Sequence, residues 1–358
     1  MTTSEGPDLN FGRRETKTPG TPPDELSWPD DDGVKIALWA PTQAGKTTFL
    51  WALLLASLRT ELKGNWLIDA QDEESRRLKQ AVIDAMTSGR SLPTATVNPG
   101  QPTSWTVFGT PEPGRRRPRD IPASLLRARS KAEQPMQFTL HLQDLPGSIF
   151  DFRTPSPHRP SVARQLARAD AFVYLHNPLI DRDDQEEQTM GFFQHMLDEV
   201  AGRSEGLVGG RLPQYVAVCI TKFDHQHVYG PALDGHFVVP AADFPHTPTI
   251  SEANAHAYFN WLCQHHAHDK ASDLVRASLE RRFDQRRVRY YATSAIGFHR
   301  EKDKPFGRRV NNGDLFRYDS EGKRVRGIDG PVFPVNVLEP VIDLSLAVLR
   351  GRDTPGRR

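Results

Sequence analysis

The feature that most constrains this chain is an apolar strand pattern followed by a glycine turn, a lysine and an apolar helix pattern. Residues 34–39 predict a buried strand, and an apolar helix is expected from about Lys46 to Leu62. Between them lies the segment Ala40-Pro41-Thr42-Gln43-Ala44-Gly45-Lys46-Thr47. It matches the pattern of a phosphate-binding loop (P-loop), except that alanine replaces the first glycine. A strand, a glycine turn and a helix in this order open an α/β nucleotide-binding fold.

Each position of this loop has a chemical reason. Small residues and Gly45 allow backbone N–H groups to approach phosphate oxygens closely. The residues expected to contact the nucleotide here are Thr42, Gln43, Ala44, Gly45, Lys46, Thr47 and Thr48. Lys46 would supply the counter-charge to phosphate, and Thr47 would offer its hydroxyl to magnesium. The N-terminus of the following helix also favours an anion.

The rest of the chain alternates strand and helix patterns. Further buried strands are predicted at residues 138–142, 171–175, 215–220 and 288–292. Helical patterns cover residues 188–200 and 254–266 and a C-terminal stretch whose apolar face holds Leu338, Val341, Ile342, Leu346 and Leu349. This alternation predicts a three-layer α/β fold with a mostly parallel sheet, and a nucleotide site at the carboxyl ends of the strands.

A second motif, Asp144-Leu145-Pro146-Gly147, directly follows a predicted strand. An aspartate at a strand end can hold magnesium through water, and Gly147 leaves room for a backbone N–H to reach a terminal phosphate. An acid-x-x-glycine turn is by itself more often only a turn.

Two further motifs end the next strands. Thr221-Lys222-Phe223-Asp224 follows residues 215–220, and Thr293-Ser294-Ala295 follows residues 288–292. Asp224 could accept two hydrogen bonds from a guanine edge, the stem of Lys222 could cover the base, and a backbone N–H at Ser294 or Ala295 could read the guanine carbonyl. Thr221 belongs to the same expected base site. Each of these motifs alone is weak, and their order along the chain is what makes them informative.

In this order, the four motifs resemble those of the Ras-like P-loop GTPases. Within that family the chain is most similar to the bacterial double-GTPase group of multi-gene systems, on the strength of LQDLPG (142–147), ITKFD (220–224) and PVNVLEPVIDL (334–344). The resemblance covers residues 34–350 apart from insertions. It implies the P-loop NTPase fold, GTP or GDP with Mg²⁺ as cofactors, and a GTPase that acts as a molecular switch within a protein assembly.

The resemblance also implies site roles and exposes departures. Lys46, Thr47 and Gly147 would be the catalytic residues, and Thr47, Asp144 and a switch threonine would hold magnesium, with Thr96 preferred to Thr94. Ser148 stands where the best-known members carry the glutamine that positions water, so slow hydrolysis is expected. Arg153 and Arg159 are candidate internal arginine fingers. Two alternatives stay open: an ATP-using P-loop enzyme (ATPase or kinase), and a nucleotide-binding scaffold without turnover.

The expected organisation is a disordered N-terminal arm (1–32), one Ras-like GTPase domain (33–350) and a disordered tail (351–358). Prolines, glycines and charges indicate insertions near 98–135, 225–250 and 299–333. These insertions would present surfaces to an effector or to a protein of a neighbouring system.

A formal net charge of +1 gives no signal for nucleic acid or membrane. Two cysteines, Cys219 and Cys263, make no disulfide framework, and no signal-peptide pattern opens the chain, so a cytoplasmic protein is expected. Cys263, His265, His266 and His268 crowd one helix end, but their spacing does not place three metal ligands on one face.

Overall fold

The computed structural model describes residues 26–41, 44–58, 66–88, 101–111, 135–146, 149, 156–179, 186–204, 206–238, 248–265, 270–298, 316–318, 324–326 and 332–352. Several residues singled out from the sequence lie outside this part of the chain: Thr42, Gln43, Thr94, Thr96, Gly147, Ser148, Arg153, His266 and His268.

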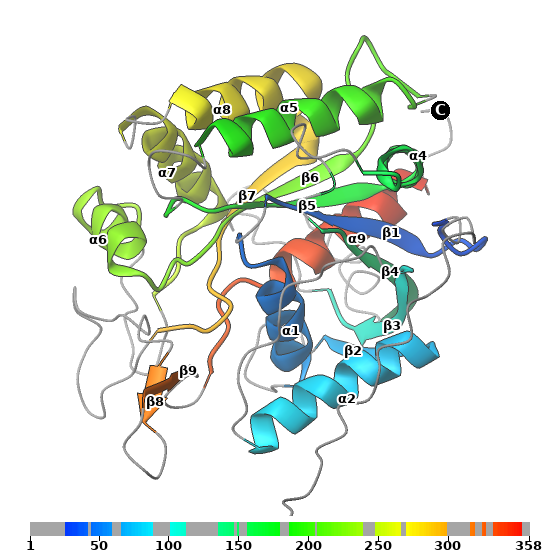
Figure 1. Cartoon of the computed structure of the whole chain (residues 1–358), viewed down its shortest axis with the longest axis horizontal. Helices are drawn as coiled ribbons and strands as arrows, with labels where there is room; N and C mark the ends of the chain where they lie inside the picture. Colours follow the sequence, from blue (N-terminus) through cyan, green and yellow to red (C-terminus); the bar gives the residue numbers. More distant parts are fainter. Residues whose placement is uncertain are drawn as a thin grey trace, which may run out of the picture.

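The core of the fold is a seven-stranded sheet with the strand order β2-β3-β4-β1-β5-β6-β7 (Figure 1). Its strands are β1 (Val34–Trp39), β2 (Leu67–Ala70), β3 (Thr103–Gly109), β4 (Met136–Asp144), β5 (Ala171–His176), β6 (Tyr215–Ile220) and β7 (Val288–Ala292). From β4 through β7 all neighbours are parallel. β3 pairs antiparallel with β4 and with β2, which forms the sheet edge.

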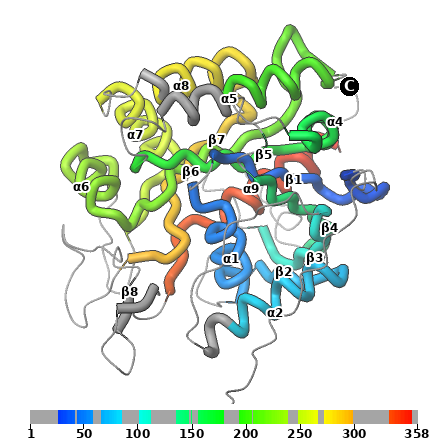
Figure 2. Tube along the Cα trace, viewed as in Figure 1, coloured from blue at the N-terminus to red at the C-terminus, as the bar shows by residue number. Residues whose placement is uncertain are grey.

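Helices cover both faces of this sheet, as the ribbon in Figure 1 and the Cα trace in Figure 2 show. They are α1 (Lys46–Ser57), α2 (Glu73–Ser88), α4 (Arg159–Ala167), α5 (Glu186–Ala201), α6 (Gln226–Asp234), α7 (Glu252–His265), α8 (Lys270–Arg282) and α9 (Leu338–Arg352). A separate antiparallel pair, β8 (Phe316–Tyr318) and β9 (Arg324–Arg326), lies outside the sheet. No helix in the described part of the chain combines the length and apolar character needed to cross a membrane.

Two apolar cores lie against the two faces. One joins α4, α5, α6, α7 and α8 to the sheet, with Phe172, Phe193 and Phe259 at its centre. The other joins α1, α2 and α9 to the opposite face, with Leu53 and Val341 fully buried. Because both faces are covered, β5 and β6 are apolar along nearly their whole length. β4, in contrast, alternates apolar and polar residues. The three-layer α/β architecture predicted from the sequence is confirmed.

The strands at 34–39, 215–220 and 288–292 have the predicted bounds. Other expectations need correction. α1 ends at Ser57 with Leu58 as its C-cap, not at Leu62. The range 98–135, expected to be an insertion, contains β3, which pairs with β4 inside the main sheet because Trp105 and Val107 are buried there.

The described parts of the ranges 1–32, 225–250 and 351–358 also differ from expectation. Trp28 donates its indole N–H to the Gln165 carbonyl at 2.7 Å, an ordered contact within the range expected to be a disordered arm. The start of 225–250 forms α6, whose Val228 and Tyr229 join the core. α9 continues to Arg352, two residues beyond the expected domain end.

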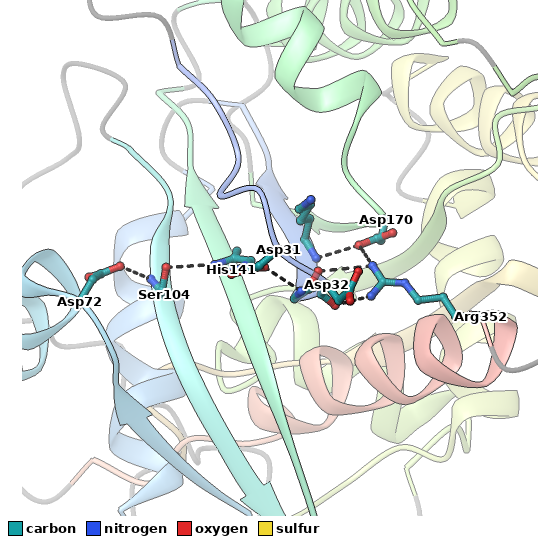
Figure 3. Close-up of polar contacts among 9 residues, drawn as sticks. Asp31, Asp32, Asp72, Ser104, His141, Asp170 and Arg352 are labelled. Carbon is teal, nitrogen blue, oxygen red and sulfur yellow. Dashed lines mark hydrogen bonds and ion pairs between the residues drawn. The ribbon is translucent and has the colours of Figure 1, made fainter.

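A polar network fastens the strands where β1 begins (Figure 3). The buried His141 ring of β4 lies 2.7 Å from the Asp31 carboxylate through Nε2 and 3.0 Å from the Ser104 hydroxyl through Nδ1. The Ser104 backbone N–H donates to Asp72, 2.6 Å away. These contacts tie the segment before β1 to β4, β3 and the start of α2.

The same edge is tied to the end of α9. Arg352 Nη2 lies 2.8 Å from Asp170 Oδ2, and the Arg352 guanidinium also donates to the carbonyls of Asp32 and Gly33 (Figure 3). Asp170 in turn accepts a 2.9 Å hydrogen bond from the Lys35 backbone N–H. The end of the sheet at which β1 begins therefore has a structural role. The predicted motifs belong to the opposite end, where the parallel strands finish.

Candidate functional site

The parallel strands bring the four motifs to one edge of the sheet. The P-loop follows β1, Asp144 ends β4, Thr221 follows β6 and Thr293 follows β7. Parallel neighbours end on the same side, so all four motifs lie where an α/β sheet binds its ligand. The order of the strands then sets which motif stands beside which.

The described part of the P-loop has a conformation that depends on glycine. Gly45 has φ 90° and ψ 25°, in the left-handed region, and it immediately precedes the first residue of α1. Its carbonyl accepts the Phe49 N–H at 2.8 Å, which closes the first turn of the helix. A side chain here would strain the backbone, although the space around an added Cβ is open. The turn therefore aims the N-terminal N–H groups of α1 toward the carboxyl edge, where they suit an anion.

Lys46 is held inside this turn. Its side chain is 8% exposed, and its Nζ donates to the carbonyls of Ala40 at 2.9 Å and Pro41 at 3.2 Å. Burial lowers the pKa of Lys46 to about 8, and the nearby Asp144 carboxylate partly opposes that shift. A buried ammonium is costly unless it is paired, so this amine is suited to a bound anion.

Asp144 stands beside the P-loop because of the strand register. It is the last residue of β4 and pairs with Leu38 of β1, two residues before the loop. Side chains alternate along a strand, and Leu140 and Leu142 pack in the core on the α1 side. Asp144 therefore projects to the side of Lys46, consistent with its effect on the pKa of that lysine. Thr47 follows Lys46 in α1, and a hydroxyl and a carboxylate are oxygen ligands of the kind that Mg²⁺ prefers.

The third and fourth motifs are joined by direct hydrogen bonds. The Phe223 N–H donates to the Thr293 carbonyl at 3.0 Å, and the Thr293 N–H donates to the Ile220 carbonyl at 2.8 Å. The Ser294 hydroxyl donates to Asp224 Oδ1 and accepts the Gly297 N–H at 2.8 Å. Residues about seventy positions apart thus form one loop pair around a single carboxylate.

The Asp224 carboxyl is buried, and its pKa is raised. It is 4% exposed, and burial raises its pKa to about 6, although the Ser294 hydroxyl and the Lys222 charge act in the opposite direction. A buried carboxylate with one hydroxyl partner still has lone pairs for further donors. This arrangement is suited to a ligand that presents N–H groups.

The residues around Asp224 are held in place. Thr221 donates its hydroxyl and its N–H to the His176 carbonyl, at 3.0 and 2.8 Å. Lys222 has φ 56°, so the chain turns sharply there, and burial lowers its pKa. Phe223 packs edge-on against Tyr229 and Phe298 behind the loop.

The two halves of the site are separated by a nucleotide-sized distance. β1 and β6 are two positions apart in the sheet, with β5 between them. Neighbouring strands lie ~4.8 Å apart, so β1 and β6, the strands that lead into the P-loop and the Asp224 loop, are about 10 Å apart. A phosphate group at one end and a base at the other can span this edge.

The structure brings most of the described candidates together: Ala44, Gly45, Lys46, Thr47, Thr48 and Asp144 at one end, and Thr221, Lys222, Asp224, Ser294 and Ala295 at the other. Arg159, a candidate arginine finger, is the first residue of α4 and donates through Nε to the Ile149 carbonyl at 2.8 Å. Cys263 is buried, and His265 stacks on Trp261. Among the described residues, no group of three His, Cys, Asp or Glu side chains is placed to hold a metal ion.

Sequence reasoning missed one part of the site. Residues 333–336, which precede α9, hydrogen-bond to the loop that carries Ser294. The only sequence signal was the PVNVLEPVIDL segment, which supported the family resemblance but was assigned no role in the site.

Comparison with known proteins gives remote structural likenesses only. No protein-family model and no curated protein matches the sequence. Among solved structures, the signal recognition particle receptor SRb-GTP/SRX complex from Chaetomium thermophilum is 15% identical with a TM-score of 0.34, over 75% of this chain and 93% of that one. The S. cerevisiae Ski7 GTPase-like domain, bound to GTP, is 13% identical with a TM-score of 0.38, over 90% of this chain.

Sup35 complexed with GDP is 11% identical with a TM-score of 0.27, over 84% of this chain. The chain spans about half or less of the other two proteins, 51% of the Ski7 chain and 42% of the Sup35 chain. At such identities and TM-scores, function has to be argued from the residues of the site.

Proposed function

We propose that the protein binds GTP and GDP with magnesium at the carboxyl edge of the sheet and acts as a molecular switch within a protein assembly. The observation that carries this proposal is Asp224, a buried carboxylate oriented by Ser294 at the same edge as the P-loop. A P-loop alone would suit any nucleoside triphosphate. The carboxylate adds a reason for choosing one base.

Guanine has two adjacent donors, a ring N–H and an exocyclic amine, and one carboxylate can accept from both. Adenine has no such pair, so it would leave Asp224 buried and unpaired, which costs about 1–3 kcal/mol. Burial of this carboxyl strengthens the discrimination, because water cannot easily replace the missing donors.

At the phosphate end, Lys46 would turn from the Ala40 and Pro41 carbonyls to the phosphate oxygens, and the N-terminus of α1 would add its backbone donors. The Thr47 hydroxyl and the Asp144 carboxylate would hold magnesium, which when bound neutralises phosphate charge. Thr96 remains our predicted switch threonine.

The switch role is proposed for the segment after β4. Asp144 would sense the metal, and Gly147 would contact the γ-phosphate, so that the segment differs between the two nucleotide states. With serine at position 148, hydrolysis by the protein alone is expected to be slow, and an effector or a neighbouring-system protein would respond to the switch.

The Asp224→Asn variant tests the base assignment. Its amide places a donor against the guanine amine but can donate to the carbonyl that xanthine carries there. GTP affinity should fall, and xanthosine triphosphate should gain relative affinity, in competition titrations. Asp273→Asn, which changes an exposed acid of α8, is the matched control and should leave both affinities unchanged. A variant that binds GTP as the parent does would favour an ATP-using enzyme instead.

A further inference from the structure

The loop that carries Ser294 is paired along its length with the segment just before α9. The Ser294 N–H donates to the Val335 carbonyl at 3.0 Å, and the Val335 N–H donates back to Ser294 at 2.8 Å. The Phe333 N–H donates to the Ile296 carbonyl at 3.1 Å. These antiparallel contacts join two segments that the stretch containing β8 and β9 separates in sequence.

Asn336 completes this pairing at the start of the loop. Its Nδ2 donates to the carbonyl of Ala292, the last residue of β7, at 3.0 Å. Its backbone has φ 48°, a left-handed conformation that asparagine tolerates better than most residues. The turn at Asn336 lets one short segment bond the loop at Ala292, Ser294 and Ile296 in succession.

The pairing reaches the carboxylate of Asp224 through one residue. Ser294 is held by Val335 through its backbone and donates its hydroxyl to Asp224. Gly297, which donates to the same hydroxyl, lies so close to the segment that an added Cβ would be 1.9 Å from the Phe333 carbonyl oxygen. A shift of the segment would therefore move the partner that orients Asp224.

The segment is itself firmly anchored. Val335 is buried in the core on the α7 side of the sheet, and Val337 and Leu338 are buried in the core on the α1 side. α9 follows at once and packs along the sheet through Val341 and Leu344. The Ser294 loop is thereby fixed to a helix of the core.

We propose that Asn336, acting with Val335, is a positioning residue that holds the Ser294 loop in its base-reading geometry and so contributes to the choice of guanine. This inference rests on the proposed guanine-nucleotide function. A loop held in the bound geometry loses less conformational entropy when the base enters, which raises affinity for the base it fits. Among the described residues, those at the phosphate end of the site, on β1 and β4, make no hydrogen bond in this pairing.

The test is the Asn336→Gly variant. Glycine adopts φ 48° without strain, so the change removes the amide donor and leaves the turn possible. Losing one hydrogen bond that orders the loop should weaken GTP binding by about three- to tenfold. ATP binding, measured by competition, should stay as in the parent, so the GTP-to-ATP preference falls. Asn336→Asp, which sets an acceptor against the Ala292 carbonyl, should lower the preference further.

Gln214→Ala is the matched control. Gln214 Nε2 donates to the Ala167 carbonyl at 3.1 Å, a bond of the same kind placed just before β6, at the opposite edge of the sheet. It should lower the thermal unfolding midpoint without changing the GTP-to-ATP preference. The inference is overturned if Asn336→Gly keeps the parent preference, or if Gln214→Ala lowers it equally. A parent that does not prefer GTP would instead overturn the proposed function.

Discussion

Nucleotide affinity should depend on pH with two limbs, one for each end of the site. In the nucleotide-free protein, burial raises the pKa of Asp224 to about 6 and lowers that of Lys46 to about 8. Guanine recognition needs the ionised Asp224, and phosphate binding needs the protonated Lys46. Affinity for GDP should therefore be highest between these two values and fall on both sides.

The size of the acid limb follows from the Asp224 pKa. At pH 5, one unit below about 6, only about a tenth of Asp224 is ionised. Affinity should then be about tenfold below its plateau, or ~1.4 kcal/mol.

The contributions of Asp224 and Lys46 to the free energy of unfolding should change with pH in the direction opposite to GDP affinity. The folded pKa of Asp224 lies above its ordinary value of 3.8, so the stability this group contributes is full below that value and is lost as pH rises through about 6. The Lys46 contribution is full above 10.5 and is lost as pH falls through about 8. On each limb, GDP affinity and the free energy of unfolding change in opposite directions.

Calorimetric titration of GDP from pH 5 to 9 at constant ionic strength measures both limbs. Asp224→Asn, titrated in parallel, should lose the acid limb and keep the alkaline one. The nucleotide's own ionisation is common to both proteins and cancels in their ratio. An acid limb that persists in Asp224→Asn, or a flat parent profile between pH 5 and 7, would refute the reasoning.

Three further predictions concern the phosphate site, the rate and the sheet edge. Lys46→Ala should weaken GTP binding by about tenfold or more in calorimetry, because a charge-assisted contact contributes about 1.5–3 kcal/mol; unchanged binding would contradict the assigned role of the lysine. Single-turnover hydrolysis of GTP should proceed at about 10⁻³ s⁻¹ or slower, as in unassisted Ras, and a rate near ~1 s⁻¹ would reveal an internal catalytic group, with Arg153 and Arg159 examined first. Arg352→Ala should lower the free energy of unfolding in urea by about 1 kcal/mol through loss of the Asp170 pair, against about 0.3–0.5 kcal/mol for Glu280→Ala, which removes one within-helix pair of α8; equal losses would argue against a fastening role for Arg352.

The strands that sequence patterns placed correctly are those with both faces buried. β6 is a continuous apolar run, β1 and β7 are apolar runs that contain one basic residue each, and the bounds of all three agree with the prediction. β3 was missed because it lies in a stretch rich in proline and arginine, and because antiparallel pairing buries Trp105 and Val107 while Phe108 stays exposed. β2 is only four residues long, too short to show a period.

At the candidate site, the features that could not be predicted from the sequence were missed for a different reason. A motif such as the P-loop is local, so its turn and helix can be read from neighbouring residues, as at Gly45 and Lys46. The pairing of Ser294 with Val335 joins segments about forty residues apart, and no periodicity encodes it. The displaced pKa of Asp224 likewise depends on burial by other elements and not on adjacent residues. The local turn and helix were therefore predictable, and the contacts that orient Asp224 were not.

The polar network around His141, at the end of the sheet where β1 begins, could not be predicted from the sequence either. His141 on its own reads as a histidine within a strand, and only the fold places Asp31 and Ser104 on its two ring nitrogens. The described residues just before β1 are ordered by this contact and by Trp28, and composition alone does not predict either contact.

The measurement that tests the central claim most directly is a calorimetric titration of the nucleotide-free, magnesium-saturated protein with GTP and, separately, with ATP. The account predicts one GTP site per chain and binding of ATP at least about fivefold weaker, the lower end of the cost of leaving Asp224 unpaired. Equal affinity for the two nucleotides, or no binding of either, would contradict it.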